Sequence, residues 1–102
     1  MSRLESLREM LADEPDDAFT RYAVALELVS LGRPAEAQAE LATLLEKSPD
    51  YVPQYFHHAK VLHGLGRVDE AAALARRGVG VAKAAGEADA ARELEELLEV
   101  WA

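Results

Sequence analysis

The chain contains no cysteine, which excludes a disulfide framework, a thiolate nucleophile and a zinc site built on cysteine. Long apolar runs are also missing. The longest uncharged apolar stretches, such as residues 22–26 and 71–75, fall far short of the roughly 20 residues that span a bilayer. Residues 1–5 carry charge from the start and are not followed by an apolar segment, which argues against a secretory signal. We therefore expect a cytoplasmic protein without a membrane-spanning segment.

Positive charge is scarce. Lysine and arginine number 11 against 19 aspartates and glutamates, and the formal net charge is −8. Contacts to phosphate dominate nucleic-acid affinity, so we expect neither a nucleic-acid partner nor an anionic membrane surface as partner. With 102 residues, of which 50% are hydrophobic and 29% charged, the chain has the balance of one globular domain spanning residues 1–102.

Proline and glycine number only four and six, and they fall mostly between segments whose apolar residues have helical spacing. No segment shows the sustained alternation of apolar and polar residues that is typical of a strand. The pattern predicts an all-α fold of about six helices. The first begins at Ser2, which forms a capping box with Glu5, and ends before Pro15; the others span residues 17–31, 34–47, 52–65, 68–85 and 88–101.

The chain repeats itself at an offset of 34 residues. Ten residues of the first segment meet identical residues in the second, several times more than this composition gives by chance. Tyr22 meets the chemically similar Phe56. The pattern indicates an internal duplication of a helix–turn–helix unit. The identical pairs are Pro15/Pro49, Asp16/Asp50, Ala25/Ala59, Leu28/Leu62, Leu31/Leu65, Gly32/Gly66, Arg33/Arg67, Glu36/Glu70, Ala37/Ala71 and Ala39/Ala73.

A 34-residue helical hairpin with small residues in both helices resembles the tetratricopeptide repeat, and the chain looks like the small stand-alone proteins of that family found in bacteria. The resemblance implies antiparallel hairpins in a right-handed superhelical array. It divides the chain into a leading half-repeat (1–14), repeat one (15–48), repeat two (49–85) and a C-terminal capping helix (86–102). It rests on small residues at the helix crossings, turn glycines and a terminal proline: Ala25, Ala37, Ala59, Ala71, Gly32, Gly66 and Pro49.

Several positions depart from the family pattern. Arg21 stands where the family favours a bulky aromatic residue, whereas its counterpart Tyr55 fits. His58 replaces an expected aliphatic residue, and Ala75 and Gly78 are smaller than usual. These departures leave the resemblance intact over two full repeats and the leading half-repeat.

The sequence offers no recognisable catalytic or metal site, and we expect neither an enzyme nor a cofactor. No serine or threonine lies in a nucleophile elbow, and no glycine-rich phosphate loop is present. His57, His58 and His63 lack the i, i+4 spacing of two helical metal ligands, so they are predicted to be packing or surface residues. Adjacent acidic pairs such as Glu95 and Glu96 point in different directions on a helix and are typical of solvated faces.

The resemblance implies a partner-binding concave face formed by the first helix of each hairpin, and hence a protein or peptide partner. Aromatic residues on this face are good anchors for a partner, but they can also fill the seam between packed helices. The clamp by which one subfamily grips terminal carboxylates needs asparagine, which this chain lacks, although a partner with an apolar anchor and a carboxylate would suit Lys60. The predicted face comprises Phe19, Tyr22, Leu26, Val29, Phe56, Lys60 and His63, with His57 nearby.

The last helix carries more apolar surface than a cap requires, which leaves a self-associating homodimer as an alternative function. Its candidate dimer contacts are Leu94, Leu97, Val100 and Trp101. Trp101 lies next to the end of the sequence, where fraying would expose it. Alternatively, Trp101 folds back onto the preceding helix, where Gly78 and Gly80 leave space.

Overall fold

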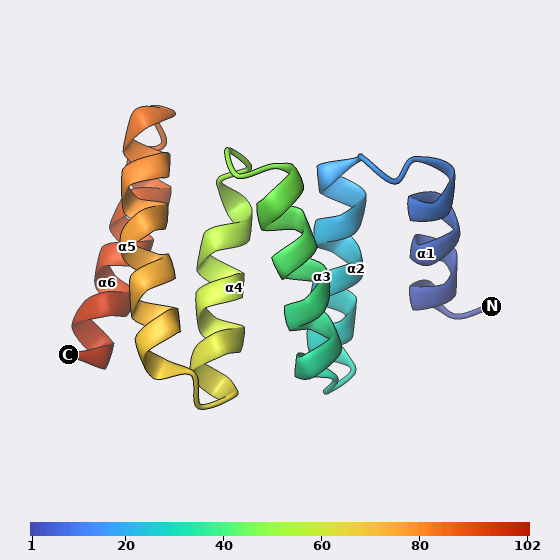
Figure 1. Ribbon diagram of the computed structural model, residues 1–102, viewed down its shortest axis with the longest axis horizontal. Helices are drawn as coiled ribbons and strands as arrows, with labels where there is room; N and C mark the ends of the chain where they lie inside the picture. The colour runs from blue at the N-terminus through green and yellow to red at the C-terminus, as the bar shows by residue number, and fades with distance from the viewer. The chain divides into compact units, whose positions relative to one another are not determined.

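The computed structural model describes residues 1–102 and contains six α-helices and no strand, which confirms the predicted all-α fold (Figure 1). Each observed end lies within one or two residues of the prediction. The chain divides into two units, Met1–Pro49 and Asp50–Ala102, each of three antiparallel helices. The helices are α1 (Arg3–Asp13), α2 (Ala18–Ser30), α3 (Pro34–Lys47), α4 (Pro53–Gly64), α5 (Val68–Ala84) and α6 (Ala88–Trp101).

The ends of the helices follow from local sequence. The Ser2 hydroxyl accepts a hydrogen bond from the backbone N–H of Glu5 at 3.1 Å, as the capping box predicts. Gly32, Gly66 and Gly86 have φ values of +70°, +81° and +76°, and the chain has no other residue with positive φ. Side chains with a Cβ rarely adopt this conformation, so these glycines fix where α2, α4 and α5 end.

The turns after α2 and α4 are the same structure built twice. The N–H of Arg33 donates to the carbonyl of Leu28, and the N–H of Arg67 donates to that of Leu62, both at 2.9 Å. Each arginine also forms a two-bond ion pair with the glutamate three residues later, at 2.6 and 2.8 Å in the first turn and 2.7 and 2.8 Å in the second. The 34-residue duplication is therefore present in atomic detail. The glutamates are Glu36 and Glu70.

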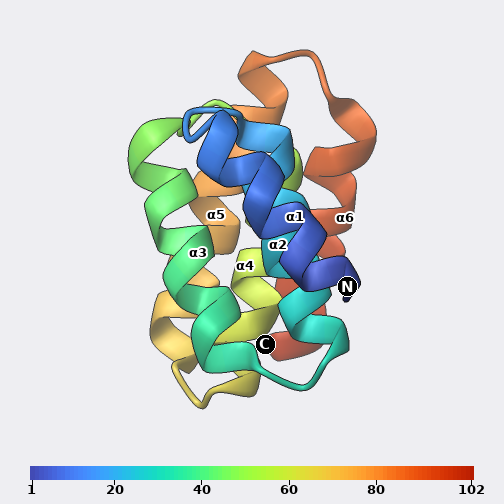
Figure 2. The same cartoon turned by 90° about the vertical axis from the view of Figure 1, so that its right-hand side faces the viewer.

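In the first unit, α2 packs against both α1 and α3 (Figure 2). Its core joins all three helices through Leu4 and Leu11 of α1, Val24 and Leu28 of α2 and Ala37 of α3. Ala37 is fully buried, as is Ala25 of α2. A side chain of this size lets the two backbones approach closely, as the repeat pattern predicts.

Arg21 stands where the family pattern predicts an aromatic residue, and it joins α2 to α3 through an ion pair. One guanidinium nitrogen donates to Glu40 of α3 at 2.9 Å, and another donates to the carbonyl of Pro15 at 3.0 Å. The ion pair is largely shielded, because only 12% of the arginine side chain and 23% of the glutamate side chain are exposed. The equivalent residue of the second unit, Tyr55, is fully buried instead. The same position thus joins the helices by charge in one repeat and by packing in the other.

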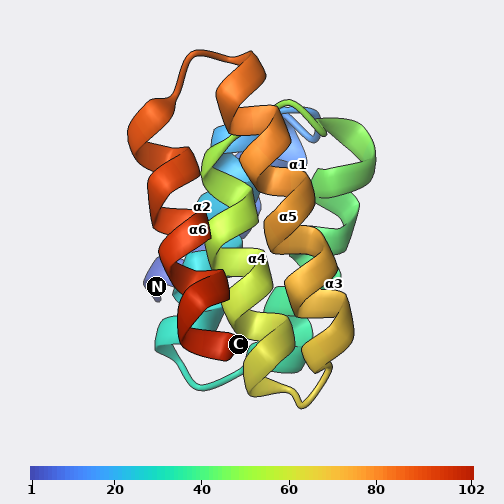
Figure 3. The ribbon, with the colours of Figure 1, turned by 90° about the vertical axis from the view of Figure 1, so that its left-hand side faces the viewer.

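In the second unit, α4, α5 and α6 all pack against one another (Figure 3). The crossing residues Ala59 and Ala71 are fully buried. Gly78 of α5 lies against Tyr55 and Leu94, so closely that an added Cβ would lie 2.6 Å from the Tyr55 Cβ and 2.9 Å from the Leu94 Cδ1. The space that Gly78 leaves is therefore filled by these two side chains and is not available to Trp101.

Candidate functional site

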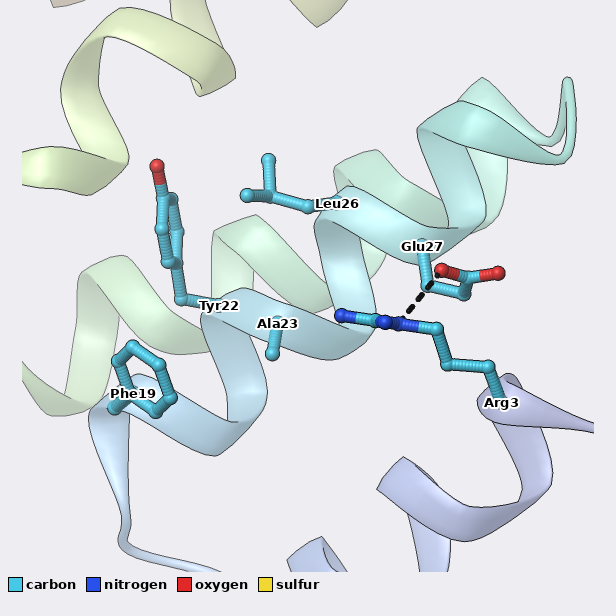
Figure 4. Close-up of a pocket in the computed structure, with 6 residues that line it drawn as sticks. All are labelled: Arg3, Phe19, Tyr22, Ala23, Leu26 and Glu27. Atoms are coloured by element: carbon cyan, nitrogen blue, oxygen red, sulfur yellow. Dashed lines mark ion pairs between the residues drawn. The ribbon is translucent and has the colours of Figure 1, made fainter.

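The first unit carries a hollow of about 230 Å³ beside α2. Its walls come mainly from one face of that helix, and the Arg3 guanidinium of α1 reaches across to the Glu27 carboxylate of α2 at 3.2 Å (Figure 4). Phe19 is 66% exposed, which is unusual for a large apolar side chain. The lining residues are Arg3, Phe19, Tyr22, Ala23, Leu26 and Glu27.

Helical geometry places these side chains opposite the core. Each residue advances about 100° around a helix, so Phe19, Tyr22 and Leu26 lie within one narrow arc. Val24 and Leu28 occupy the opposite side of α2 and are fully buried. Tyr22 and Leu26 are half-buried, at the edge between core and solvent. Because one side of α2 already faces the core, the other side is left with aromatic surface that no other helix of this unit covers completely.

The second unit carries a hollow of the same volume, about 230 Å³, between α4 and α6. Phe56 of α4 meets Leu97 and Val100 of α6, and Val100 is 79% exposed. Two carboxylates, Glu93 and Glu96, also border this hollow. On α6 these four residues follow the i, i+3, i+4, i+7 spacing that Phe19, Tyr22, Ala23 and Leu26 show on α2.

Charged and aromatic groups surround Phe56. The Lys60 ammonium lies over the ring, 5.2 Å from its centroid, and His57 meets the ring edge-on with centroids 5.5 Å apart. Burial lowers the pKa of His57, and the positive charge of Lys60 lowers it further. His57 is therefore held in its neutral form at neutral pH. Lys60, which the sequence suggested as a contact for a partner carboxylate, is exposed and does not line the hollow.

Trp101 is the last residue of α6 and is half-buried. Its ring stacks on that of His63 of α4, with centroids 4.4 Å apart and planes inclined by 6°. Neither alternative that the sequence offered for Trp101 included this contact with α4. The sequence shows a large aromatic residue near its end, but only the tertiary fold brings α6 alongside α4 so that His63 can receive it.

The structure also corrects the candidate dimer face. Leu94 is only 1% exposed and belongs to the core, where it packs against Gly78. Leu97 and Val100 line the same hollow as Phe56. Phe56, predicted on the concave face, and Leu97 and Val100, predicted as dimer contacts, therefore line one hollow. Val29 is 41% exposed on α2, outside the lining of the first hollow. The proximity of Tyr22 to Phe56 stays a prediction.

Sequence reasoning missed five of the lining residues. Arg3, Ala23 and Glu27 of the first hollow, and Glu93 and Glu96 of the second, are not among the candidates. The i, i+3, i+4, i+7 spacing that Glu93 and Glu96 share with Leu97 and Val100 is visible in the sequence and could have grouped them. The sequence predicts a solvated charge at Glu96, because nothing in a sequence shows that Phe56 lies near it.

The two hollows carry no cluster of metal-ligating side chains. The structure has no group of three or more histidine, aspartate or glutamate side chains placed to hold a metal ion. His58 is 4% exposed, and burial lowers its pKa to about 4, with a further contribution from the charge of Arg67. His58 is thus a neutral packing residue. None of the six helices combines the length and apolar character needed to cross a bilayer.

Duplicated helical hairpins with small crossing residues and glycine-ended turns define a helical-repeat protein. The family model described as "Tetratricopeptide repeat" matches residues 1–79, and the chain belongs to this family. The family fold implies a protein–protein interaction module, and such modules are generally non-catalytic. A search of the curated proteins gave no match.

Solved structures agree with this assignment. A tetratricopeptide repeat domain protein from Salinibacter ruber is 34% identical to the chain; its crystal structure superposes with a TM-score of 0.80 and covers 83% of this chain and 94% of that one. A solution structure of a tetratricopeptide repeat domain protein from the same organism gives a TM-score of 0.81, with coverage of 86% and 89%. A protein from Bordetella parapertussis, 23% identical, gives a TM-score of 0.85 over 99% of this chain and 88% of that one, which shows the same fold.

Proposed function

We propose that the chain is a non-catalytic interaction module that binds a partner peptide or helix through the apolar and aromatic faces of α2 and α4. The observation that carries the proposal is the hollow beside α2, which has Phe19 at 66% exposure together with half-buried Tyr22 and Leu26. Exposed aromatic surface around a concavity is a common feature of protein interfaces.

The alternative role of these aromatics, as filler of a seam between helices, fits the observed exposure less well. A filler residue is buried, as Tyr55 is, whereas Phe19 is mostly exposed and Tyr22 and Phe56 are each half-buried. Half-buried rings can be covered further by a partner with little loss of side-chain entropy. Tyr22 and Phe56 occupy equivalent positions in the two repeats, which supports the same role for both.

The test is a selection of random 12-residue peptides displayed on phage against the intact chain. Binding of the selected peptides is then measured by fluorescence anisotropy and mapped by amide chemical shifts. We expect ligands with an apolar anchor, shifts around Tyr22 or Phe56, and at least a tenfold loss of affinity in a Phe19→Ala or Phe56→Ala variant. Val68→Ala is the matched control, because Val68 is an exposed apolar residue, 45% exposed, on α5.

Two results would contradict the proposal. The first is that no peptide is enriched over a selection on the carrier alone. The second is that the enriched peptides bind equally well to both phenylalanine variants. Circular dichroism of each variant shows whether its helices remain, so loss of binding through unfolding is recognised separately.

Self-association remains a second candidate function because Val100 is 79% exposed beside the half-buried Leu97. A two-fold dimer would bury this patch twice. Sedimentation equilibrium of the intact chain and of a Val100→Asp variant tests this candidate. A dimer that is lost in the variant supports it, and a monomer at high micromolar concentration contradicts it.

A further inference from the structure

The hollow of the second unit combines an apolar floor with an acidic border. Phe56, Leu97 and Val100 supply the apolar surface, and Glu93 and Glu96 supply two carboxylates on the same helical face. In the hollow of the first unit, by contrast, the one carboxylate, Glu27, is paired with Arg3 at 3.2 Å. The two hollows have equal volumes and different charges, so they differ in the chemistry they favour.

The negative charge at this hollow is only partly offset. Five acidic residues lie on α6, against the single basic residue Arg92. Arg92 is 3.0 Å from the Asp89 carboxylate but 3.9 Å from that of Glu96, and all of these side chains are more than half exposed. Lys60 is the only lysine or arginine on α4, and its ammonium lies 5.2 Å from the centroid of the Phe56 ring, outside the lining. The border of the hollow therefore presents net negative charge.

We infer that the hollow between α4 and α6 binds a cationic partner segment, in which a lysine or arginine lies beside an apolar side chain. The inference rests on the proposed interaction function and specifies the partner of one of its two hollows. The apolar side chain contacts Phe56, Leu97 and Val100, and the cation lies between the carboxylates of Glu93 and Glu96. Charge complementarity of this kind selects partners and accelerates their association.

The same charges disfavour two other occupants. A second copy of the chain, docked by a two-fold axis on this face, would bring the carboxylates of two α6 helices together. A partner carboxylate, which the sequence suggested on the basis of Lys60, would meet Glu93 and Glu96 as well. The position of these glutamates beside Phe56 therefore reverses the charge expected of the partner.

The test uses the same random 12-residue display library, selected in parallel on the intact chain and on a Glu93→Lys/Glu96→Lys variant. We expect wild-type ligands that map to α4 and α6 to be enriched in lysine or arginine next to leucine, phenylalanine or a similar residue. We expect the variant to bind them about three- to tenfold more weakly and to select acidic ligands instead. Raising the salt from 0.05 to 0.5 M should weaken wild-type binding, because exposed charges are screened.

Glu95→Lys/Glu99→Lys is the matched control. It makes the same change of charge on the same helix, but neither glutamate lines the hollow, and Glu95 is 3.9 Å from Lys83 of α5. Equal losses in the control and in the hollow variant would mean that overall charge, and not this site, is responsible, and would overturn the inference.

The remaining outcomes separate the inference from the function on which it rests. Neutral or acidic ligands at α4 and α6, ligands that map only to α2, or occupation of the hollow by a second copy of the chain would each overturn the inference while leaving an interaction module. A library that yields no ligand at all would overturn both the inference and the proposed function.

Discussion

Two glycines of α5, only two residues apart, are expected to respond in opposite ways to replacement by alanine. In a helix interior, alanine is favoured over glycine by about 1 kcal/mol, because glycine loses more backbone freedom on folding. At Gly80 the added Cβ meets nothing within 4 Å. Gly80→Ala should therefore stabilise the protein by about 0.5–1 kcal/mol.

At Gly78 the same methyl group meets a packed environment. Its Cβ would lie 2.6 Å from the Cβ and 2.9 Å from the Cγ of Tyr55, and 2.9 Å from the Cδ1 of Leu94. Leu94 can move its terminal methyl group, but the Tyr55 Cβ moves only with the backbone of α4. Overpacking of this kind costs roughly 1–3 kcal/mol, which exceeds the helical gain, so Gly78→Ala should destabilise by about 1–2 kcal/mol.

Urea unfolding measures both changes, followed by circular dichroism and by the fluorescence of Trp101, the only tryptophan. A difference of about 2 kcal/mol between the variants corresponds to roughly 8–16 °C in melting temperature for a domain of this size. The slope of free energy against urea should stay unchanged, which would show that the substitutions changed the stability and not the compactness of the unfolded chain. If Gly78→Ala stabilised the protein as much as Gly80→Ala, the close packing of Tyr55 and Leu94 around α5 would be refuted.

Three further predictions follow from local packing and charge. Ala71→Leu should destabilise by roughly 1–3 kcal/mol through overpacking at a fully buried crossing, and an unchanged thermal melt would contradict the assigned register. Gly66→Ala should lower the free energy of unfolding by about 1–2 kcal/mol, because the φ of Gly66 is +81°. Gly64→Ala should not lower it, because an added Cβ there meets nothing within 4 Å. Equal denaturation midpoints of the two variants would refute this. The pKa of His58 is about 4 in the folded state, and its ordinary value is 6.5. Between these pH values the unfolded chain carries a proton on this residue and the folded chain does not, so protonation favours unfolding. Stability should therefore be complete above pH 6.5 and fall by up to about 3 kcal/mol toward pH 4, and His58→Leu should flatten this slope in urea titrations; a slope unchanged by the substitution would contradict the assignment.

Much of the fold could be predicted from sequence because its signals are local. A capping serine, prolines in first turns and glycines with positive φ act within a few residues of where they stand, so the helix ends were predicted to within two residues. The burial of Ala25, Ala37, Ala59 and Ala71 followed from the duplication, because equivalent residues of a repeat have equivalent surroundings. The aromatic residues on α2 were expected on one face because the resemblance to the tetratricopeptide repeat implies it.

The candidate site of the second unit could not be predicted in this way. Its residues come from α4 and α6, which are separated in the chain by all of α5. Leu94, Leu97 and Val100 look alike in sequence as one apolar stripe, but Leu94 packs against Gly78 in the core and Val100 is 79% exposed. A difference of this kind depends on where the neighbouring helices lie, and one helix considered alone does not contain that information.

The sequence by itself determined the helices, the turns and the duplicated hairpin, because hydrogen bonding and backbone preference act over a few residues and repeat with the residues that cause them. Only the tertiary structure decided which apolar side chains became core and which became surface. It placed Trp101 on His63, and it joined Phe56 to Glu93 and Glu96 at one acidic, apolar hollow. The physical reason is that burial and electrostatic environment are properties of side chains brought together from distant segments, and the packing of whole helices fixes them.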